Sequence, residues 1–244
     1  MEIPPVSRRE GQAIHEIKSR DMLVFTPRDI ARFLRTSRVN THRIISSMKR
    51  KGLLTTVERG KYMLTESWGE LDVYEIVPEI FKPSYIGFWS ALHYHGMTDQ
   101  VPRTVFVATT KRKKPLRIQG QAIVYVTIKS RLFFGYERFG KVVVSDREKT
   151  VIDCLRHPEY SGGVEQVYRA VTDELDAGKI VDYCVRAGSS AIAARLGYLM
   201  ERRGLEFEKD RLKAILGTYT KLDPTGGRWG LEPGWKLYVN REMA

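Results

Sequence analysis

The chain contains little cysteine and no long apolar run. Its 244 residues include two cysteines, Cys154 and Cys184, which have neither a CxxC pair nor the spacing of a zinc site. Two buried, reduced thiols are therefore expected, and a single disulfide stays open as the alternative. No apolar stretch has the length of a membrane span, and the first residues lack the pattern of a secretory signal. We expect a cytoplasmic protein with no membrane partner.

The sequence also lacks the short motifs of several large enzyme classes. It contains no GxxxxGKS or GxxxxGKT phosphate loop, no GxGxxG after a strand, no HExxH and no GxSxG. Asp153 lies in an apolar helical pattern without a second carboxylate to form a catalytic pair. We therefore predict that the protein is not an enzyme and needs neither a cofactor nor a metal.

Positive charge is abundant and unevenly distributed. The net charge is +12, and 42% of the residues are apolar, which is enough for packed cores. Residues 1–64 hold 14 Lys and Arg against 6 Asp and Glu, so they carry +8 of the total. This asymmetry indicates a polyanionic partner for the N-terminal part, because charge supplies affinity for phosphate.

Residues 38–51 have the pattern of an amphipathic helix. Thr41, Ile44, Ile45 and Met48 recur at the spacing that one helix face buries. The opposite face carries donors rather than Glu–Lys pairs, which suits the major groove of DNA. A solvated surface helix is the alternative for this segment taken alone.

The flanking sequence favours DNA binding. Thr26 and Pro27 can begin a preceding helix, Ser37 can cap the helix at 38–51, and Gly52 can end it. Residues 53–57 and 61–64 are strand-like and are joined by a turn containing Gly60. Helix, turn, helix and hairpin in this order predict a winged helix-turn-helix.

The predicted DNA contacts fall on the 38–51 helix, its cap and the hairpin. Arg38, Asn40 and Arg43 are expected to read base edges, and Val39 a thymine methyl. Ser37, Ser47 and Arg50 are expected to bind phosphate, and Arg59 and Lys61 to contact the backbone or minor groove.

The remaining residues predict a second domain of mixed type. Residues 104–109, 123–128 and 141–145 are strand candidates, and residues 85–94 are predicted to form a helix. Ser145 and Glu148 fit a capping box at the start of another helix. We predict an α+β protein with a winged helix-turn-helix at 1–64, a structured linker at 65–83, and a mixed C-terminal domain at 84–244.

A strongly basic run separates the first two of these strands. It consists of five residues: Lys111, Arg112, Lys113, Lys114 and Arg117. A solvated hairpin loop is one interpretation. The other is a second contact to nucleic acid or to an acidic protein surface.

The order of elements resembles a known family. A basic winged helix precedes SYIGFWSALHYHGMTDQVPRTVFVAT, then a KRKK segment, then KVVVSDREKTVIDCL. This arrangement is similar to the AbiEi-type antitoxin and transcriptional regulator family, over most of the chain and most clearly from residue 26 to about 170. The Ser-Ala-Leu-x-x-x-Gly pattern at 90–96 carries much of the resemblance.

The resemblance implies a type IV toxin-antitoxin system. In that family the winged helix binds inverted repeats upstream of its own operon and represses it. The C-terminal domain opposes a toxin with a nucleotidyltransferase fold, without requiring a stable complex. Double-stranded DNA and such a toxin are therefore the expected partners. Two copies on an inverted repeat would not require a dimer in solution.

We therefore predict a sequence-specific transcriptional repressor that is also an antitoxin. Two other classes stay open. One is a nuclease or modification enzyme acting on nucleic acid, targeted by the winged helix. The other is a scaffold whose winged helix binds protein only; the charge of residues 1–64 argues against it.

Overall fold

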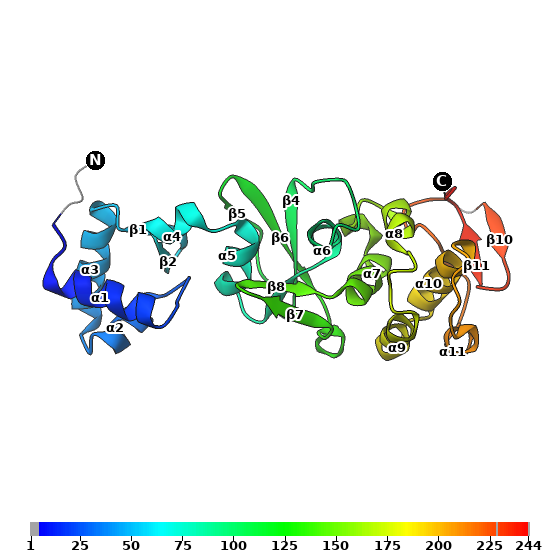
Figure 1. The fold of residues 1–244 in the computed structure, drawn as a ribbon, viewed down its shortest axis with the longest axis horizontal. Coiled ribbons are helices and arrows are strands. Elements are labelled where there is room, and N and C mark those ends of the chain that lie inside the picture. Colours follow the sequence, from blue (N-terminus) through cyan, green and yellow to red (C-terminus); the bar gives the residue numbers. More distant parts are fainter. Residues whose placement is uncertain (1–4, 228, 244) are drawn as a thin grey trace. The chain divides into compact units, whose positions relative to one another are not determined.

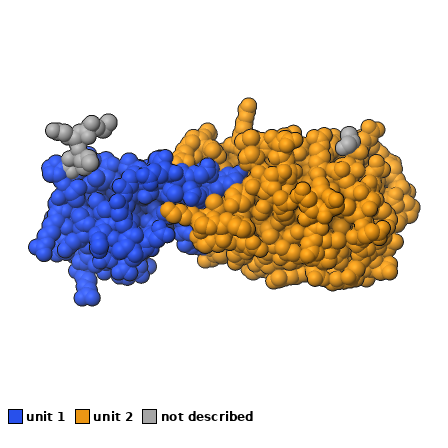
Figure 2. Space-filling view, in the orientation of Figure 1, with its two compact units in different colours: residues 1–82 blue, residues 83–244 orange. Residues whose placement is uncertain are grey.

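The computed structural model describes residues 5–227 and 229–243 and shows an α+β protein (Figure 1). The chain divides into two compact units, residues 1–82 and residues 83–244 (Figure 2). We call them the first and the second unit and describe each by itself. No helix in the described part is long and apolar enough to cross a membrane.

Three helices and a hairpin form the N-terminal part of the first unit. They are α1 (Arg8–Ser19), α2 (Pro27–Phe33), α3 (Arg38–Arg50), β1 (Leu54–Glu58) and β2 (Lys61–Leu64). Their buried apolar side chains form one core: Ala13, Ile17, Phe25, Ile30, Leu34, Ile45, Met48, Leu54 and Leu64. The predicted helix at 38–51 and the predicted pair of strands are confirmed.

Local capping explains where these helices begin. Ser7 and Glu10 form a capping box at α1, and Thr26 and Asp29 form one at α2. The Ser37 hydroxyl accepts a hydrogen bond from the Asn40 backbone amide at 3.3 Å, as predicted for α3.

The hairpin is antiparallel and closes at Gly60, whose φ is +78°. A positive φ of this size strongly favours glycine, which explains why the turn has Gly60 at this position. Phe25 adds a single bridge to β2, with its amide donating to the Tyr62 carbonyl at 3.0 Å and the reverse bond at 2.9 Å. The connector before α2 therefore pairs with the hairpin.

The segment predicted as a structured linker is helical. It forms α4 (Thr65–Glu70) and α5 (Val73–Ile80), and the first unit extends to residue 82. Asp72 caps α5 through the Tyr74 amide at 2.8 Å. Val73, Ile76, Val77 and Ile80 are buried, which is why this segment is not a loose connection.

The second unit contains a mixed six-stranded sheet in the order β5-β6-β4-β3-β8-β7. Its strands are β3 (Ser84–Ile86), β4 (Thr104–Thr109), β5 (Leu116–Ile118), β6 (Gln121–Thr127), β7 (Tyr136–Phe139) and β8 (Val142–Ser145). Strands β4 and β6 run parallel, whereas β3 is antiparallel to β4 and parallel to β8.

Helices and a small second sheet complete this unit. The helices are α6 (Phe88–Tyr94), α7 (Arg147–Arg156), α8 (Val164–Ala170), α9 (Ala177–Ala187), α10 (Ser190–Arg202) and α11 (Lys209–Lys213), with two short 3-10 turns, η1 (Ser130–Leu132) and η2 (Pro158–Tyr160). The small sheet has the order β10-β11-β9, with β9 (Thr220–Lys221), β10 (Gly230–Glu232) and β11 (Leu237–Val239). One apolar core joins the large sheet to α6–α11.

Three local predictions for the second unit are wrong. Residues 85–94 are not one helix, because Ser84–Ile86 form β3, in which Ile86 pairs with Val107 on one side and Val144 on the other. A three-residue strand is too short to show a period of two. The helix α6 begins only at Phe88.

The basic run does not lie in a hairpin between the first two predicted strands. Those strands, β4 and β6, are parallel, so the chain between them must return to the starting edge before β6 begins. Residues 110–115 make that return, and β5 then forms the hairpin with β6.

The predicted capping box at Ser145 is absent. Asp146 caps α7 instead, accepting from the Lys149 amide at 2.8 Å. Ser145 is still in β8, and its hydroxyl lies 2.7 Å from that of Thr150. The Glu148 carboxylate pairs with Lys179 at 2.8 Å and accepts from the Asp176 amide at 3.1 Å.

Candidate nucleic-acid interface

Helix α3 buries one face and leaves the other open to solvent. Thr41, Ile45 and Met48 are buried. On the opposite face Val39 is 61% exposed. The predicted base-reading residues Arg38, Asn40 and Arg43 are all exposed, together with the predicted phosphate contact Arg50.

The exposed face of α3 is positively charged and holds no carboxylate. The helix contains no Asp or Glu, and within residues 5–227 and 229–243 no ion-pair partner is found for Arg38, Arg43 or Arg50. Among residues 5–66, five of the six acids pair with other bases, and Asp21 is the exception. The pairs are Glu66–Lys18 (2.6 Å), Glu16–Arg20 (2.9 Å), Asp29–Arg32 (3.3 Å), Glu10–Lys51 (2.6 Å) and Glu58–Lys61 (2.8 Å).

Two grooves run along this face. One, of about 600 Å³, is lined by Val39, His42, Arg43, Ser46, Ser47 and Arg50. The other, of about 470 Å³, is lined by Pro27, Arg28, Ala31, Arg38, Thr41 and His42. The grooves therefore contain five of the predicted contacts, Arg38, Val39, Arg43, Ser47 and Arg50, whereas Ser37 and Asn40 line neither groove. They also contain two exposed side chains that were not predicted, Arg28 and His42.

The helical pattern alone does not single out those two residues. Arg28 is in the first turn of α2, close in sequence to its Thr26 cap, and His42 directly precedes Arg43 on the donor-rich side of α3. Both positions required knowing how the two helices pack, because each residue is ordinary on its own helix.

Two predicted contacts are already engaged inside the first unit. Ser47 is half-buried and hydrogen-bonds the Glu10 carboxylate. Lys61 donates to the Ile80 carbonyl, pairs with Glu58 and lies 5.9 Å from the centre of the Phe81 ring. These contacts hold the N-terminus of α1 to α3 and the hairpin to α5, so neither side chain is freely available to a phosphate.

Arg59 differs from Lys61. It is exposed beside Gly60 at the tip of the hairpin, and no acidic partner is found for it in the part of the chain that the structure describes. The tip therefore presents one free guanidinium, in a position suited to a phosphate or a minor groove.

The second basic surface lies in the second unit. Lys111, Arg112 and Lys114 are exposed, Lys113 is half-buried, and Arg117 donates to the Gly120 carbonyl at 3.0 Å. Residues 100–136 contain eight Lys and Arg and no Asp or Glu. The positively charged segment is therefore longer than the five basic residues named in the sequence, and it contains no acid.

The second unit contains a buried ionic cluster. Asp153 accepts from the Tyr85 hydroxyl at 2.7 Å and pairs with Lys149, and all three side chains are buried. Burial raises the pKa of Tyr85, and the neighbouring Asp153 raises it further, so the phenol stays protonated. Among residues 5–227 and 229–243, no three His, Cys, Asp or Glu side chains gather as metal ligands.

The fold has a counterpart among solved structures. The crystal structure of the RV2827C protein from Mycobacterium tuberculosis matches 96% of this chain and 92% of its own, with a TM-score of 0.54 and 13% sequence identity. At this identity the likeness concerns the fold, and it extends over both units. No protein-family model matches the chain, and no curated protein matches it.

Proposed function

We propose that the protein is a sequence-specific DNA-binding transcriptional regulator whose residues 1–64 form a winged helix-turn-helix. The observation that carries this proposal is the exposed face of α3. It combines unpaired arginines, an exposed valine and no carboxylate, while five of the six acids in residues 5–66 pair with other bases. A face of this composition fits the donors, acceptors and methyl groups of a major groove.

In this proposal the N-terminal half of α3 enters the major groove. Arg38 and Arg43 read guanine, Asn40 reads adenine, and Val39 contacts a thymine methyl. Ser37 and Arg50 bind phosphate, and Arg59 contacts the backbone or minor groove from the hairpin. Arg28 and His42 join the contact surface because they line the same grooves. Ser47 and Lys61 act indirectly, by positioning α3 and the hairpin.

Arg43→Ala is expected to weaken binding to a specific duplex by about 1–3 kcal/mol, because a bidentate contact to a base is lost. The measurement is fluorescence anisotropy of the full chain on a duplex selected from a random library, and on a scrambled duplex of the same composition. Lys18→Gln is the matched control, since it removes one positive charge that already pairs with Glu66. An equal loss on both duplexes would reduce Arg43 to a phosphate contact.

We further propose that residues 111–117 make a second, sequence-independent contact to nucleic acid. Lys111→Gln/Arg112→Gln/Lys114→Gln is expected to weaken binding to every duplex and to reduce the slope of log K against log salt by about two to three units. The control is Lys209→Gln/Arg211→Gln/Lys213→Gln, which removes three charges from α11, two of them paired with Glu201 and Asp182. An unchanged slope in the loop variant would make residues 110–115 a solvated connection only.

The antitoxin role is a separate proposal, and it is supported by the sequence resemblance in residues 84–155. It assigns to the second unit the neutralisation of a nucleotidyltransferase-like toxin. Co-expression of the full chain with such a toxin, encoded beside it, tests the role through growth. If growth is not restored, the antitoxin role is rejected and the DNA-binding proposal is unaffected.

A further inference from the structure

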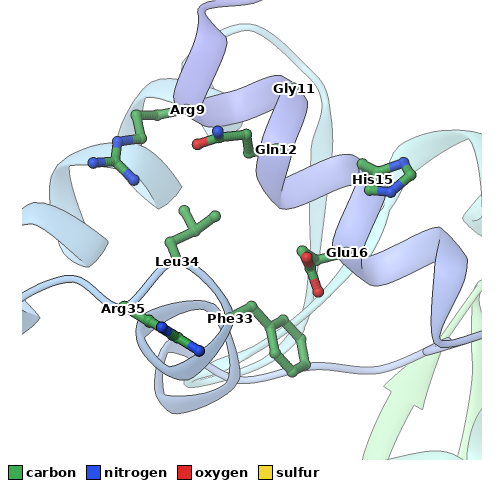
Figure 3. A pocket seen from close by; sticks show the side chains of 8 residues that line it. All are labelled: Arg9, Gly11, Gln12, His15, Glu16, Phe33, Leu34 and Arg35. Carbon is green, nitrogen blue, oxygen red and sulfur yellow. The ribbon is translucent and has the colours of Figure 1, made fainter.

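A groove of about 510 Å³ lies between α1 and the end of α2 (Figure 3), and it shares no lining residue with the two grooves described above. Helix α1 contributes Arg9, Gly11, Gln12, His15 and Glu16, and the end of α2 contributes Phe33, Leu34 and Arg35. Leu34 lies between the two elements, with Arg9 on the α1 side and Arg35 on the α2 side.

The backbone of Arg35 is unusual. Its φ is +44°, in the left-handed region, directly after the C-cap residue of α2. The Thr36 amide donates to the Ala31 carbonyl at 3.1 Å, which is the long closing bond of a Schellman motif. Glycine is the favoured residue at this position, as at Gly52 and Gly188 after α3 and α9. Asp21 has the same conformation after α1, with φ +47°, so the backbone alone assigns no role to either side chain.

The groove carries positive charge that is not neutralised locally. Glu16, its one acid, is bound by Arg20 through bonds of 3.0 and 2.9 Å. Arg9 and Arg35 are both exposed, and no acidic partner for either is present among the residues described. Gln12 is exposed and lines the same groove with an amide donor. Two free guanidiniums and an amide around one groove suit a phosphate group.

Its place in the chain identifies the source of that phosphate. Arg35 is two residues before Ser37, the N-cap of α3. In a helix-turn-helix the recognition helix enters the major groove by its N-terminus while the preceding elements cross the sugar–phosphate backbone. In such an arrangement the turn between α2 and α3 would lie beside the backbone.

We infer that Arg9 and Arg35 form a phosphate-binding site for duplex DNA, outside the α3 face, that fixes the position of the backbone beside the groove read by α3. This inference rests on the proposed DNA-binding function. Such a site would lengthen the DNA footprint without adding base contacts.

The test separates stability from binding in one substitution. Arg35→Gly removes the backbone strain and the guanidinium together, so the melting temperature of the first unit is expected to rise by about 2–6 °C. Affinity for duplex DNA is expected to fall about fivefold at 0.15 M salt, and the slope of log K against log salt by about one unit. Arg9→Gln should produce the same loss of affinity without the gain in stability.

Arg35→Lys and Lys18→Gln are the controls for charge. Arg35→Lys keeps the positive charge and should retain most of the salt slope, whereas Lys18→Gln removes a charge already paired with Glu66 and should bind as the wild type does. If the wild-type chain binds duplex DNA and both Arg35→Gly and Arg9→Gln bind with unchanged affinity and slope, the phosphate site is rejected. If the wild-type chain binds no duplex at all, the proposed function itself has failed.

Discussion

Asp153→Ala is expected to lower the free energy of unfolding of the second unit by about 3–5 kcal/mol, because it leaves the Lys149 ammonium buried without its carboxylate. The Lys149 side chain is 1% exposed and that of Asp153 is 3% exposed. The Tyr85 hydroxyl, which donates to Asp153 and accepts from Lys149 at 3.1 Å, would lose its acceptor as well.

The measurement is urea unfolding of the full chain followed by tryptophan fluorescence, since three of the four tryptophans, at 89, 229 and 235, lie in the second unit. Asp182→Ala is the control: its carboxylate pairs with Arg211 at 2.7 Å but is 63% exposed, so the loss should stay below about 1 kcal/mol. Lys149→Met/Asp153→Leu should recover most of the stability, because it removes both charges. A cost below 1 kcal/mol for Asp153→Ala would contradict the burial of this pair.

Acidification is expected to destabilise the first unit through Glu10. Burial alone would raise the pKa of this carboxyl group, but hydrogen bonds from Lys51, from the Ser7 amide and hydroxyl and from Ser47 outweigh it and lower the pKa from 4.5 to about 2. A carboxylate whose pKa is lower in the folded state stabilises the fold above the unfolded-state pKa. That contribution, about 3 kcal/mol, is lost as the pH falls from about 4.5 through 2.

The variant Glu10→Gln isolates this effect from other acids. At pH 7 it should be less stable than the wild type, and the difference should shrink steadily between pH 4.5 and 2. Hydrogen–deuterium exchange of the α1 and α3 amides reports on the first unit within the full chain. Glu16→Gln is the control, because Glu16 sits two turns along α1 in an exposed pair with Arg20. If the difference in stability between the wild type and Glu10→Gln does not change with pH, the lowered pKa of Glu10 does not contribute to stability.

The elements that the sequence predicted correctly are those with long, regular patterns. Helix α3 has a capped start at Ser37, a 3.6-residue apolar stripe and a glycine at its end, so each local signal agrees with the next. The hairpin is similar, with a glycine where φ must be positive. These two elements are also the ones that carry the candidate interface.

The misjudged elements depended on contacts far apart in sequence. Strand β3 exists because Ile86 pairs with both Val107 and Val144, and no three-residue pattern predicts that. Glu148 was assigned to a capping box by spacing, but the folded chain supplies Lys179 and the Asp176 amide as better partners. Competition of this kind is decided by tertiary packing.

The candidate interface shows the same limit. The sequence predicts that Lys61 contacts DNA from the hairpin. In the structure, however, the strand register places Lys61 opposite Glu58, and its ammonium group donates to the Ile80 carbonyl. Arg28, His42 and Arg35 gain their significance only from the grooves that they line. Charge and helical period indicate a candidate binding helix from sequence, but they do not identify which basic side chains are free.

The most direct test of DNA reading by α3 is the affinity of the full chain for duplex DNA, measured by fluorescence anisotropy at two salt concentrations. The probes are a duplex selected from a random library, or the region upstream of its own operon, and a scrambled duplex. The account predicts that the specific duplex binds about a thousandfold or more tightly than the scrambled one and still binds at the higher salt. Weak, equal binding to both that disappears with salt would contradict it, because the basic face of α3 would then hold phosphate without reading sequence.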